Sequence, residues 1–408
     1  MSRVLIIGGG ASGMVAAIKA SLNNEVILID KNSNLGKKIL MTGNGKCNYW
    51  NSDININHYN SSDLDVLDKI ITDNNKKLVE GFFDDLGIVP RIRDGYYYPM
   101  SNQATSIQTA LILECKLRGV KIITDSEVVS VIKENDLFRV VTTNNTIEVE
   151  KVVLAMGSKA SLKNGDDLGC KIVSSLGHTI IPILPALVQI KLNASFLKDW
   201  HGIRQDGMVS LYQKNKLIKQ EYGEIQLTDY GISGICVFQL SSKISRGLFN
   251  DIENQIEINF LSNLDIKDEY EFVEYLNKRN KLLNGRNISE LLDGVLNYKL
   301  INLILKISKV DRYEYLDNIS YDKLLKVGIN FTKLRLDVTG TKGYEAAQVC
   351  SGGVKLSEIN PYTMESLIMK DLYIVGELLD VDGDCGGFNL GFAWISGYLA
   401  GRSISNND

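Results

Sequence analysis

The sequence is poor in the residues that build metal centres and disulfide frameworks. It has three histidines in 408 residues, and its six cysteines form neither a C-x-x-C pair nor a spacing typical of zinc ligands. We therefore expect no metal site and no disulfide framework. This cysteine usage favours a reducing cytoplasm as the location of the protein.

Segments that would send the chain to a membrane or bind it to a polyanion are also missing. The first residues carry neither a basic region nor a cleavage signal, so their apolar run is predicted to be a strand. Residues 385–401 are uncharged but too short and too rich in glycine to span a bilayer, and they predict a buried helix. A net charge of −4 gives no general argument for binding nucleic acid or an anionic membrane.

What the sequence does contain is a dinucleotide-binding pattern at its beginning. An apolar strand at residues 4–7 leads into G-x-G-x-x-G, formed by Gly8, Gly10 and Gly13, and then into a predicted helix. A second apolar strand, residues 25–29, ends at Asp30. The glycines suit a tight turn, close approach to a pyrophosphate and close helix packing, while Asp30 can accept hydrogen bonds from ribose hydroxyls. An acid at this position favours FAD or NAD over a 2′-phosphorylated cofactor.

Three further segments match the needs of a bound FAD. Residues 36–48 combine glycines, which allow close approach, with lysines that can neutralise a pyrophosphate. Residues 154–157 end a buried strand with small side chains that let the chain pass beside the adenosine. Residues 372–377 form a strand that ends in Gly376 and Glu377, whose carboxylate can bind ribitol hydroxyls. The helix predicted at 391–400 would direct its N-terminal amides at the flavin, where they stabilise negative charge.

The remaining motifs resemble one family. Four segments are similar to the BaiN/RdsA-type, or YhiN-like, bacterial NAD(P)/FAD-dependent oxidoreductases: Thr42-Gly-Asn-Gly-Lys-Cys-Asn48, residues 177–182, residues 185–188 and Gly376-Glu-Leu-Leu-Asp-Val-Asp-Gly383. Residues 348–354 and 386–389 match this family as well. The resemblance covers essentially the whole chain. It implies an α/β fold with a glutathione-reductase-like, Rossmann-type FAD-binding domain and an inserted β-barrel that carries a helical subdomain.

Composition along the chain agrees with this organisation. Residues 187–262 read as short strands and 265–325 as charged helices, and the glycine-rich composition returns after 350. We therefore place the FAD-binding domain at 1–186 and 336–408, the barrel at 187–264 and 326–335, and the helical subdomain at 265–325. The barrel insertion is expected to cover the flavin and to form the substrate pocket.

The residues expected to bind the cofactor come from all of these motifs. They are Gly8, Gly10, Ala11, Ser12, Gly13, Asp30, Lys31, Lys38, Thr42, Gly43, Cys47, Asn48, Val128, Ala155, Met156, Gly157, Gly376, Glu377, Asp382, Gly387, Phe388, Asn389 and Leu390. Strand ends share one edge of a Rossmann sheet, so Cys47, Asn48 and residues 386–390 are expected to surround the flavin ring.

The sequence departs from the family pattern at three places. Where the family usually has Ala-Thr-Gly-Gly, this chain has Ala155-Met156-Gly157-Ser158. Of the family's Gly-Ser-Thr-Gly-Asp segment, residues 159–169 keep only Gly165-Asp166. After Gly234 the family has a proline, and this chain has Ile235. These changes leave the FAD-binding pattern intact and concern the substrate side.

No catalytic residue follows from the sequence alone. Cys47 and Cys385 are candidates for redox-active thiols, although two small packing residues would look the same. His178 reads as the end of a helix and His201 as a surface residue. The tyrosines at 96–98 either line a pocket or alternate between core and surface.

The expected function is transfer of hydride from NAD(P)H to FAD and on to a small organic acceptor, with an activated C=C bond as one candidate. No second G-x-G-x-x-G occurs in a strand context, so the nicotinamide would visit the flavin transiently. Two alternatives stay open: a flavin-dependent RNA-modifying protein, which the acidic balance disfavours, and a flavin-binding redox sensor without turnover.

Overall fold

The computed structural model describes residues 1–161 and 167–406 and divides the chain into two compact units. Unit 1 consists of Met1–Leu184 and Val349–Asp408, and unit 2 of Pro185–Gln348. Gly165 and Asp166, the only residues that keep the family's Gly-Asp pattern, lie outside the described residues.

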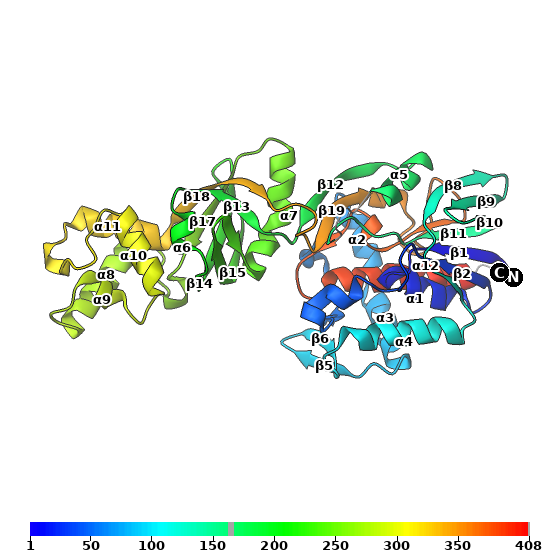
Figure 1. Ribbon diagram of the computed structural model, residues 1–408, viewed down its shortest axis with the longest axis horizontal. Coiled ribbons are helices and arrows are strands. Elements are labelled where there is room, and N and C mark those ends of the chain that lie inside the picture. Colours follow the sequence, from blue (N-terminus) through cyan, green and yellow to red (C-terminus); the bar gives the residue numbers. More distant parts are fainter. Residues whose placement is uncertain (162–166, 407–408) are drawn as a thin grey trace. The chain divides into compact units, whose positions relative to one another are not determined.

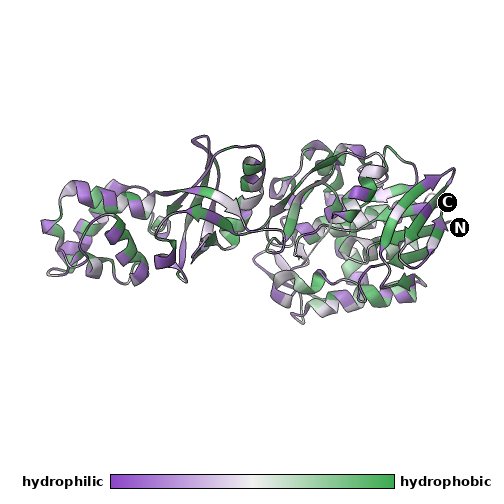
Figure 2. Cartoon of the chain, turned by 45° about the horizontal axis from the view of Figure 1, so that its top comes forward, coloured by the Kyte–Doolittle hydropathy of each residue, from purple (hydrophilic) through white to green (hydrophobic). Residues whose placement is uncertain are grey.

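A five-stranded parallel sheet forms the centre of unit 1. Its strands, in spatial order, are β20 (Leu372–Ile374), β11 (Lys151–Leu154), β1 (Arg3–Ile7), β2 (Glu25–Ile29) and β7 (Lys121–Ile123). The apolar runs of β1, β2, β11 and β20 are almost fully buried, as their composition predicts. Figure 2 shows hydrophobic residues, in green, along strands of this unit. Because the strands are parallel, their carboxyl ends meet at one edge.

Two helices from opposite ends of the chain pack tightly within this unit (Figure 1). α1 (Ala11–Ala20) follows β1, and α12 (Phe388–Asn406) is the C-terminal helix. A Cβ atom added at Gly397 or Gly401 of α12 would lie 2.3 or 2.5 Å from the carbonyl oxygens of Ser12 and Ala16 on α1. Glycine is therefore required at both positions by the close approach of the two backbones.

Smaller sheets and helices surround the central sheet of unit 1. The strands are β3 (Trp50–Asn51), β4 (Tyr59–Asn60), β5 (Pro90–Arg93), β6 (Tyr96–Pro99), β8 (Val128–Glu134), β9 (Leu137–Thr142), β10 (Thr146–Val149), β12 (Ile180–Ala186), β19 (Val349–Val354) and β21 (Asp382–Gly383). The helices are α2 (Leu64–Ile70), α3 (Asp73–Asp85), α4 (Ala104–Leu117) and α5 (Leu168–Ser175).

Unit 2 is a closed six-stranded barrel with helices attached to it (Figure 1). Around the barrel run β13 (Ile190–Asn193), β16 (Gly231–Ser233), β15 (Lys216–Thr228), β14 (Arg204–Gln213), β17 (Asn254–Asn259) and β18 (Leu334–Thr341). Its helices are α6 (Leu197–Trp200), α7 (Ile235–Phe249), α8 (Glu269–Leu282), α9 (Ile288–Leu292), α10 (Tyr298–Ile307) and α11 (Tyr321–Thr332). Four of these helices, α8 to α11, are inserted between β17 and β18, and the unit has a hydrophobic core of its own.

The boundaries within the insertion differ from those expected from composition. The helices run to Thr332 rather than ending at residue 325, and the barrel continues to Thr341, beyond residue 335. The reason is β18, which pairs with β13 and β17 and buries Leu334, Leu336 and Val338 in alternation. Among the described residues, no helix is long and apolar enough to cross a membrane.

Candidate cofactor site

The turn from β1 into α1 leaves room and hydrogen-bond donors for an anion. Gly8 has φ of 108°, and an added Cβ would lie 2.3 Å from the carbonyl oxygen of Ala155, while one at Gly13 would lie 1.9 Å from that of Gly8. Gly10 is different, because no described atom lies within 4 Å of a Cβ built there. No described side chain caps α1, whose first internal hydrogen bond is donated by Met14 N–H. The preceding N–H groups are thus available to a phosphate.

Asp30 stands at the end of β2 and holds this turn. Its Oδ2 accepts a hydrogen bond from Gly9 N (2.7 Å), and its Oδ1 accepts from Asn32 N (2.7 Å) and Asn32 Nδ2 (2.9 Å). A carboxylate has about four acceptor positions, so Oδ2 can accept one more donor. Lys31 forms an exposed ion pair with Glu127 at 3.3 Å, next to the buried Val128 at the start of β8.

Glu377, in the turn after β20, gathers groups from distant parts of the chain. Its carboxylate accepts hydrogen bonds from Lys38 Nζ (2.6 Å), Ser158 Oγ (2.6 Å) and Cys350 N (3.1 Å). The adjacent Gly376 lies against α1, because an added Cβ would be 2.5 Å from Ser12 Oγ. The structure therefore brings the 36–48, 155–158 and 376–377 segments together with the first turn of α1.

The 36–48 segment forms a kinked 3-10 helix over Ile39–Gly45 and then a tight turn. Gly43, Asn44 and Cys47 have positive φ values near 55°. Cys47 is a free, buried thiol; burial raises its pKa to about 11 against a smaller lowering by the hydrogen bond with Thr42. A thiol with this pKa is not a thiolate at neutral pH, which favours a packing role for Cys47 over a redox role.

Asn48 and the start of α12 are direct neighbours. An added Cβ at Gly387 would lie 2.7 Å from Trp50 O and 3.0 Å from Asn48 Oδ1, and Asn51 Nδ2 donates to Gly386 O at 2.8 Å. Among the described residues, none donates a hydrogen bond to the buried Asn48 Oδ1. An orphaned acceptor of this kind costs free energy unless a ligand supplies the donor.

Three alternating aspartates in the segment before α12 form hydrogen bonds to residues 58–62. The side chains of Asp380, Asp382 and Asp384 accept from Ser62 N (2.8 Å), Asn60 Nδ2 (3.0 Å) and the His58 ring, following the antiparallel pairing of β4 and β21. Asn389 completes the turn by bonding the N–H and the carbonyl of Gly383. The contacts of Asp382 and Asn389 thus shape the loop before α12.

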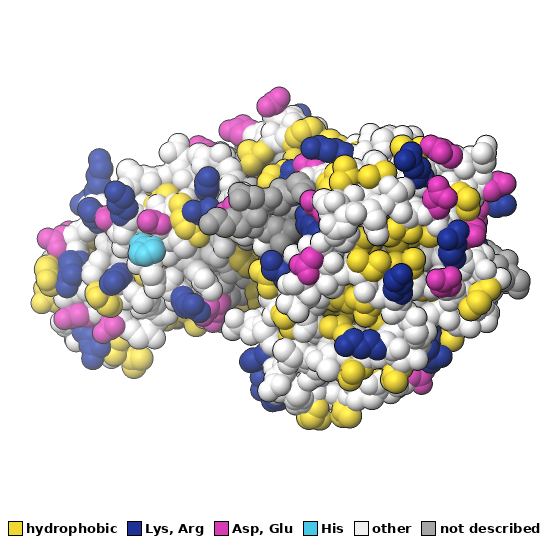
Figure 3. All heavy atoms as spheres, turned by 45° about the vertical axis from the view of Figure 1, so that its right-hand side comes forward, with side chains coloured by type: hydrophobic (Ala, Val, Ile, Leu, Met, Phe, Trp, Pro, Cys, Tyr) yellow, Lys and Arg dark blue, Asp and Glu magenta, His cyan; other side chains and the backbone are white. Residues whose placement is uncertain are grey.

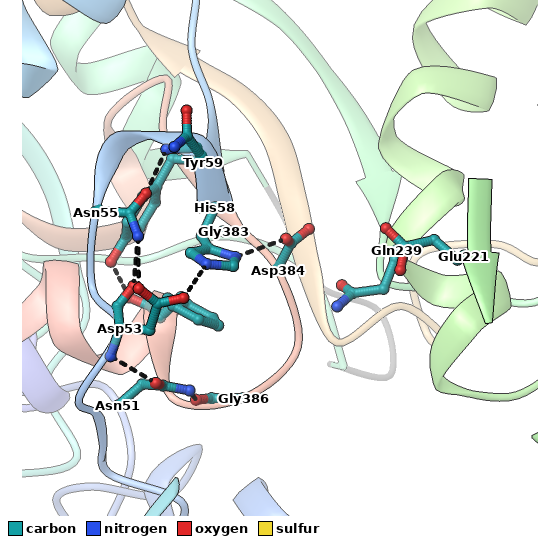
Figure 4. A network of polar contacts seen from close by, with 12 residues as sticks. Asn51, Asp53, Asn55, His58, Tyr59, Glu221, Gln239, Gly383, Asp384 and Gly386 are labelled. Atoms are coloured by element: carbon teal, nitrogen blue, oxygen red, sulfur yellow. Dashed lines mark hydrogen bonds and ion pairs between the residues drawn. The ribbon is translucent and has the colours of Figure 1, made fainter. Parts of the chain in front are cut away.

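His58 is a site residue that sequence reasoning missed (Figure 4). Its Nε2 lies 2.9 Å from Asp53 Oδ2 and its Nδ1 lies 3.1 Å from Asp384 Oδ2. The imidazole ring stacks on Phe388, the first residue of α12, at a centroid distance of 4.3 Å. The only signal in the sequence was the Asp-x-Asp-x-Asp pattern at 380–384, which indicates a strand with one polar face but does not say which segment pairs with it.

Successive tyrosines of β6 point to opposite faces of the strand. Tyr97 packs edge-on against Tyr49 in the core. The ring of Tyr96 lies 2.6 Å from a Cβ built at Gly386, and that of Tyr98 lies 3.5 Å from one at Gly43. Tyr96 and Tyr98 therefore face the two glycine loops, whereas Tyr97 does not.

The other two histidines have different surroundings. His178 has a fully buried side chain; Nδ1 lies 2.9 Å from Glu358 Oε2 and Nε2 lies 2.8 Å from Ser366 Oγ. It joins the turn after α5 to the segment after β19. His201 is exposed in unit 2. Neither arrangement points to catalysis.

The site as a whole fits FAD on structural grounds. Gly10 and Gly157 both leave open space where a Cβ would meet no described atom. The amides at the start of α1, which no described side chain caps, lie beside Gly10. Asp30 has a free acceptor position, and Asn48 Oδ1 has no hydrogen-bond donor among the described residues. These features match, in order, a pyrophosphate, a ribose and the polar edge of a flavin ring.

Comparisons with known proteins agree over the full length of the chain. The model of the HI0933-like protein Rossmann domain matches residues 2–403. The chain is 36% identical over 413 residues to the 3-dehydro-bile acid delta(4,6)-reductase of Clostridium scindens, covering 99% of both chains. It is 27% identical over 407 residues to the ribosomal RNA dihydrouridine synthase of Escherichia coli, covering 98% of this chain and 97% of that one. For the enzyme of the same name from Haemophilus influenzae the identity is 28% over 412 residues, covering 99% and 98%.

The predicted fold class, a Rossmann-type FAD-binding domain with an inserted barrel, is confirmed, and the protein is a flavoprotein oxidoreductase. The chain belongs to the HI0933-like family.

Proposed function

We propose that this protein is an FAD-dependent reductase of carbon–carbon double bonds that are conjugated to a carbonyl group, with NAD(P)H as the hydride donor. The observation that carries the proposal is the meeting of Asn48 with the start of α12, where a buried amide oxygen has no donor among the described residues. When bound there, FAD supplies a group that accepts a hydride from a nicotinamide and passes it to an acceptor.

The residues of the chain divide the binding of FAD among them. The N-terminus of α1 with Gly10 would hold the pyrophosphate, and the remaining acceptor position of Asp30 would bind the adenosine ribose. Glu377, fixed by Lys38 and Ser158, would bind ribitol hydroxyls. The first N–H groups of α12 and Asn48 would hold the flavin ring, where the helix N-terminus stabilises the negative charge of the reduced form.

The acceptor class follows from what two kinds of relative have in common. One relative is named as a reductase of 3-dehydro-bile acids at the delta-4,6 positions, and the others as synthases of dihydrouridine in ribosomal RNA. Both names describe saturation of a double bond conjugated to a carbonyl group. We therefore propose this chemistry for the present chain, whichever molecule carries the double bond.

A small molecule is the preferred acceptor over RNA. The net charge is −4, and acidic and basic side chains are interspersed on the face shown in Figure 3. Proteins that neutralise many phosphates instead gather Lys and Arg into a basic face or stripe. The higher identity to the bile-acid reductase, 36% against 27%, favours the same choice.

An anaerobic acceptor screen tests the proposal. The purified protein should be yellow, release FAD on heating, and lose its flavin absorbance when NADH or NADPH is added. Reoxidation is then followed with cyclohex-2-enone, androst-4-ene-3,17-dione and a uridine-containing ribosomal RNA fragment. Reoxidation by an enone supports the proposal, and reoxidation by the RNA alone would keep the proposed chemistry but replace the small-molecule acceptor with RNA. A flavin that is reduced but that none of the three reoxidises would contradict the proposed reductase and favour a redox sensor.

A further inference from the structure

Both ring nitrogens of His58 lie within hydrogen-bonding distance of a carboxylate. Each ring nitrogen faces a carboxylate oxygen, Nε2 at 2.9 Å from Asp53 and Nδ1 at 3.1 Å from Asp384. An ionised carboxylate only accepts, so each contact is a hydrogen bond only if a proton lies between the two atoms. Two protons shared among three groups correspond to an imidazolium between two carboxylates. If one proton is lost, a lone pair of the ring faces a carboxylate.

The three residues form a path from water to the loop at the start of α12 (Figure 4). The Asp53 side chain is 71% exposed, that of His58 28% and that of Asp384 13%. Asp384 directly precedes the Cys385-Gly386-Gly387 turn, and its N–H donates to His58 O at 2.8 Å. Stacking on Phe388 fixes the plane of the ring at the first residue of α12. The exposed end of the path can therefore exchange protons with solvent, while the other end stands in the loop that leads into α12.

Charged and titratable groups surround the ring. The hydrogen bond from His58 is the main cause that lowers the pKa of Asp53, with a further lowering by the positive charge of Lys76. Tyr59 is buried beside Asp384, where burial raises the pKa of its phenol, so it stays neutral and donates its hydroxyl to Phe388 O at 2.9 Å. The titratable and charged groups around the ring are thus Asp53, Asp384, Lys76 and the neutral Tyr59.

We propose that Asp53, His58 and Asp384 form a proton relay that supplies the proton consumed when the double bond is reduced; the inference rests on the proposed function. Hydride from the nicotinamide-reduced cofactor forms the new C–H bond at the β-carbon, and the π electrons move onto the carbonyl oxygen as an enolate. A proton from the relay, delivered at Asp384, then forms the C–H bond at the α-carbon. The relay recovers its proton from water through Asp53. In this scheme His58 acts through Asp384 and is a positioning residue.

A single-turnover experiment separates proton delivery from cofactor binding. The FAD-loaded protein is reduced with a stoichiometric amount of dithionite and mixed anaerobically with cyclohex-2-enone, androst-4-ene-3,17-dione or ferricyanide. Ferricyanide takes electrons without protonation of a carbon, so it reports the amount of reduced cofactor. His58→Gln should slow reoxidation by the enones at least tenfold and leave that by ferricyanide unchanged. His201→Gln, at an exposed position in unit 2, is the matched control and should leave both unchanged.

A second pair of variants decides the question if His58→Gln loses FAD. Asp53 is exposed, so Asp53→Asn should fold normally, and the enone rate should fall because the ring loses one of its two carboxylate partners while the ferricyanide rate stays unchanged. Free imidazole should restore at least part of the enone rate to His58→Ala. Wild-type enone rates in the His58 and Asp53 variants would overturn the relay. If the wild-type protein itself is not reoxidised by either enone, the proposed function fails first.

Discussion

Two glycines of the same motif illustrate how single residues serve different ends. Gly13 is required by the fold, because a side chain would strike the carbonyl of Gly8. Gly10 has an ordinary φ of −82°, and an added Cβ would meet no described atom, so the fold does not require a glycine there. What requires it, in the proposed function, is the cofactor.

We expect Gly10→Ala to leave the apoprotein as stable as the wild type while weakening FAD binding at least tenfold. The methyl group would occupy the space proposed for the pyrophosphate, and a tenfold loss corresponds to about 1.4 kcal/mol. Urea unfolding of the apoprotein and an FAD titration measure the two effects. Gly13→Ala is the contrast and should fail to fold. Unchanged FAD affinity in Gly10→Ala would argue against this placement of the pyrophosphate.

His178 should make stability depend on pH. Burial lowers its pKa from the ordinary 6.5, against a smaller raising by Glu358, so the unfolded chain takes up the proton more readily than the folded one. For Glu358, burial raises the pKa, but hydrogen bonds from Thr179 and His178 outweigh it, and the net pKa lies below the ordinary 4.5. Both shifts have the same consequence: the free energy of unfolding falls as the pH drops, first below about 6.5 and further below about 4.5.

Urea unfolding midpoints of the wild type and His178→Gln, measured from pH 8 to pH 5, test this. The wild type should lose stability below about pH 6.5, whereas the variant, which has no titrating ring, should show a flatter dependence over the same range. Parallel curves would show that His178 does not carry the effect.

At the scale of elements, the contact of α1 with α12 connects the first motif with the last. Gly401 lies so close to α1 that an added Cβ would stand 2.5 Å from Ala16 O and 2.7 Å from Lys19 Cβ. This packing also positions Gly376, which lies against the Ser12 side chain of α1 and donates its N–H to Ser396 Oγ on α12. The start of the cofactor site is therefore positioned by a helix pair.

Gly401→Ala should destabilise the protein by about 1–3 kcal/mol, although the same change within an unconstrained helix is stabilising. The expected cause is that the two helices must separate. Thermal or urea unfolding measures the loss, and Arg402→Ala, at the next position on α12, serves as the control for altered helix propensity. Equal stability of the two variants would mean that the backbones can move apart at little cost.

At the scale of the whole molecule, each unit has its own core. The barrel of unit 2 is closed, so it has no free edge strands, and its interior is filled by its own apolar side chains. The two ends of this unit are also close, since Gln348 N–H donates to Leu187 O at 3.2 Å. These features are typical of a domain inserted into another.

We expect residues 185–348, expressed alone, to unfold cooperatively and to bind no FAD. The complementary chain, residues 1–184 joined to 349–408 by a short Gly/Ser linker, should bind FAD, because the residues proposed to hold it lie in unit 1. Circular dichroism during urea unfolding and flavin absorbance after reconstitution measure both parts. If residues 185–348 showed no cooperative unfolding transition, the barrel would not be an independently folding unit.

The sequence by itself determined the first βαβ unit, the buried strands, the insertion between them and the family. These features depend on local information: runs of apolar residues at a strand period, glycines at fixed spacing and an acid at a strand end. Tertiary structure decided the rest. That His58 pairs with Asp384, 326 positions away, that Tyr96 and not Tyr97 faces Gly386, and that β18 closes the barrel follow from strand pairing and register. Those pairings join distant segments, and no pattern within one segment specifies its partner.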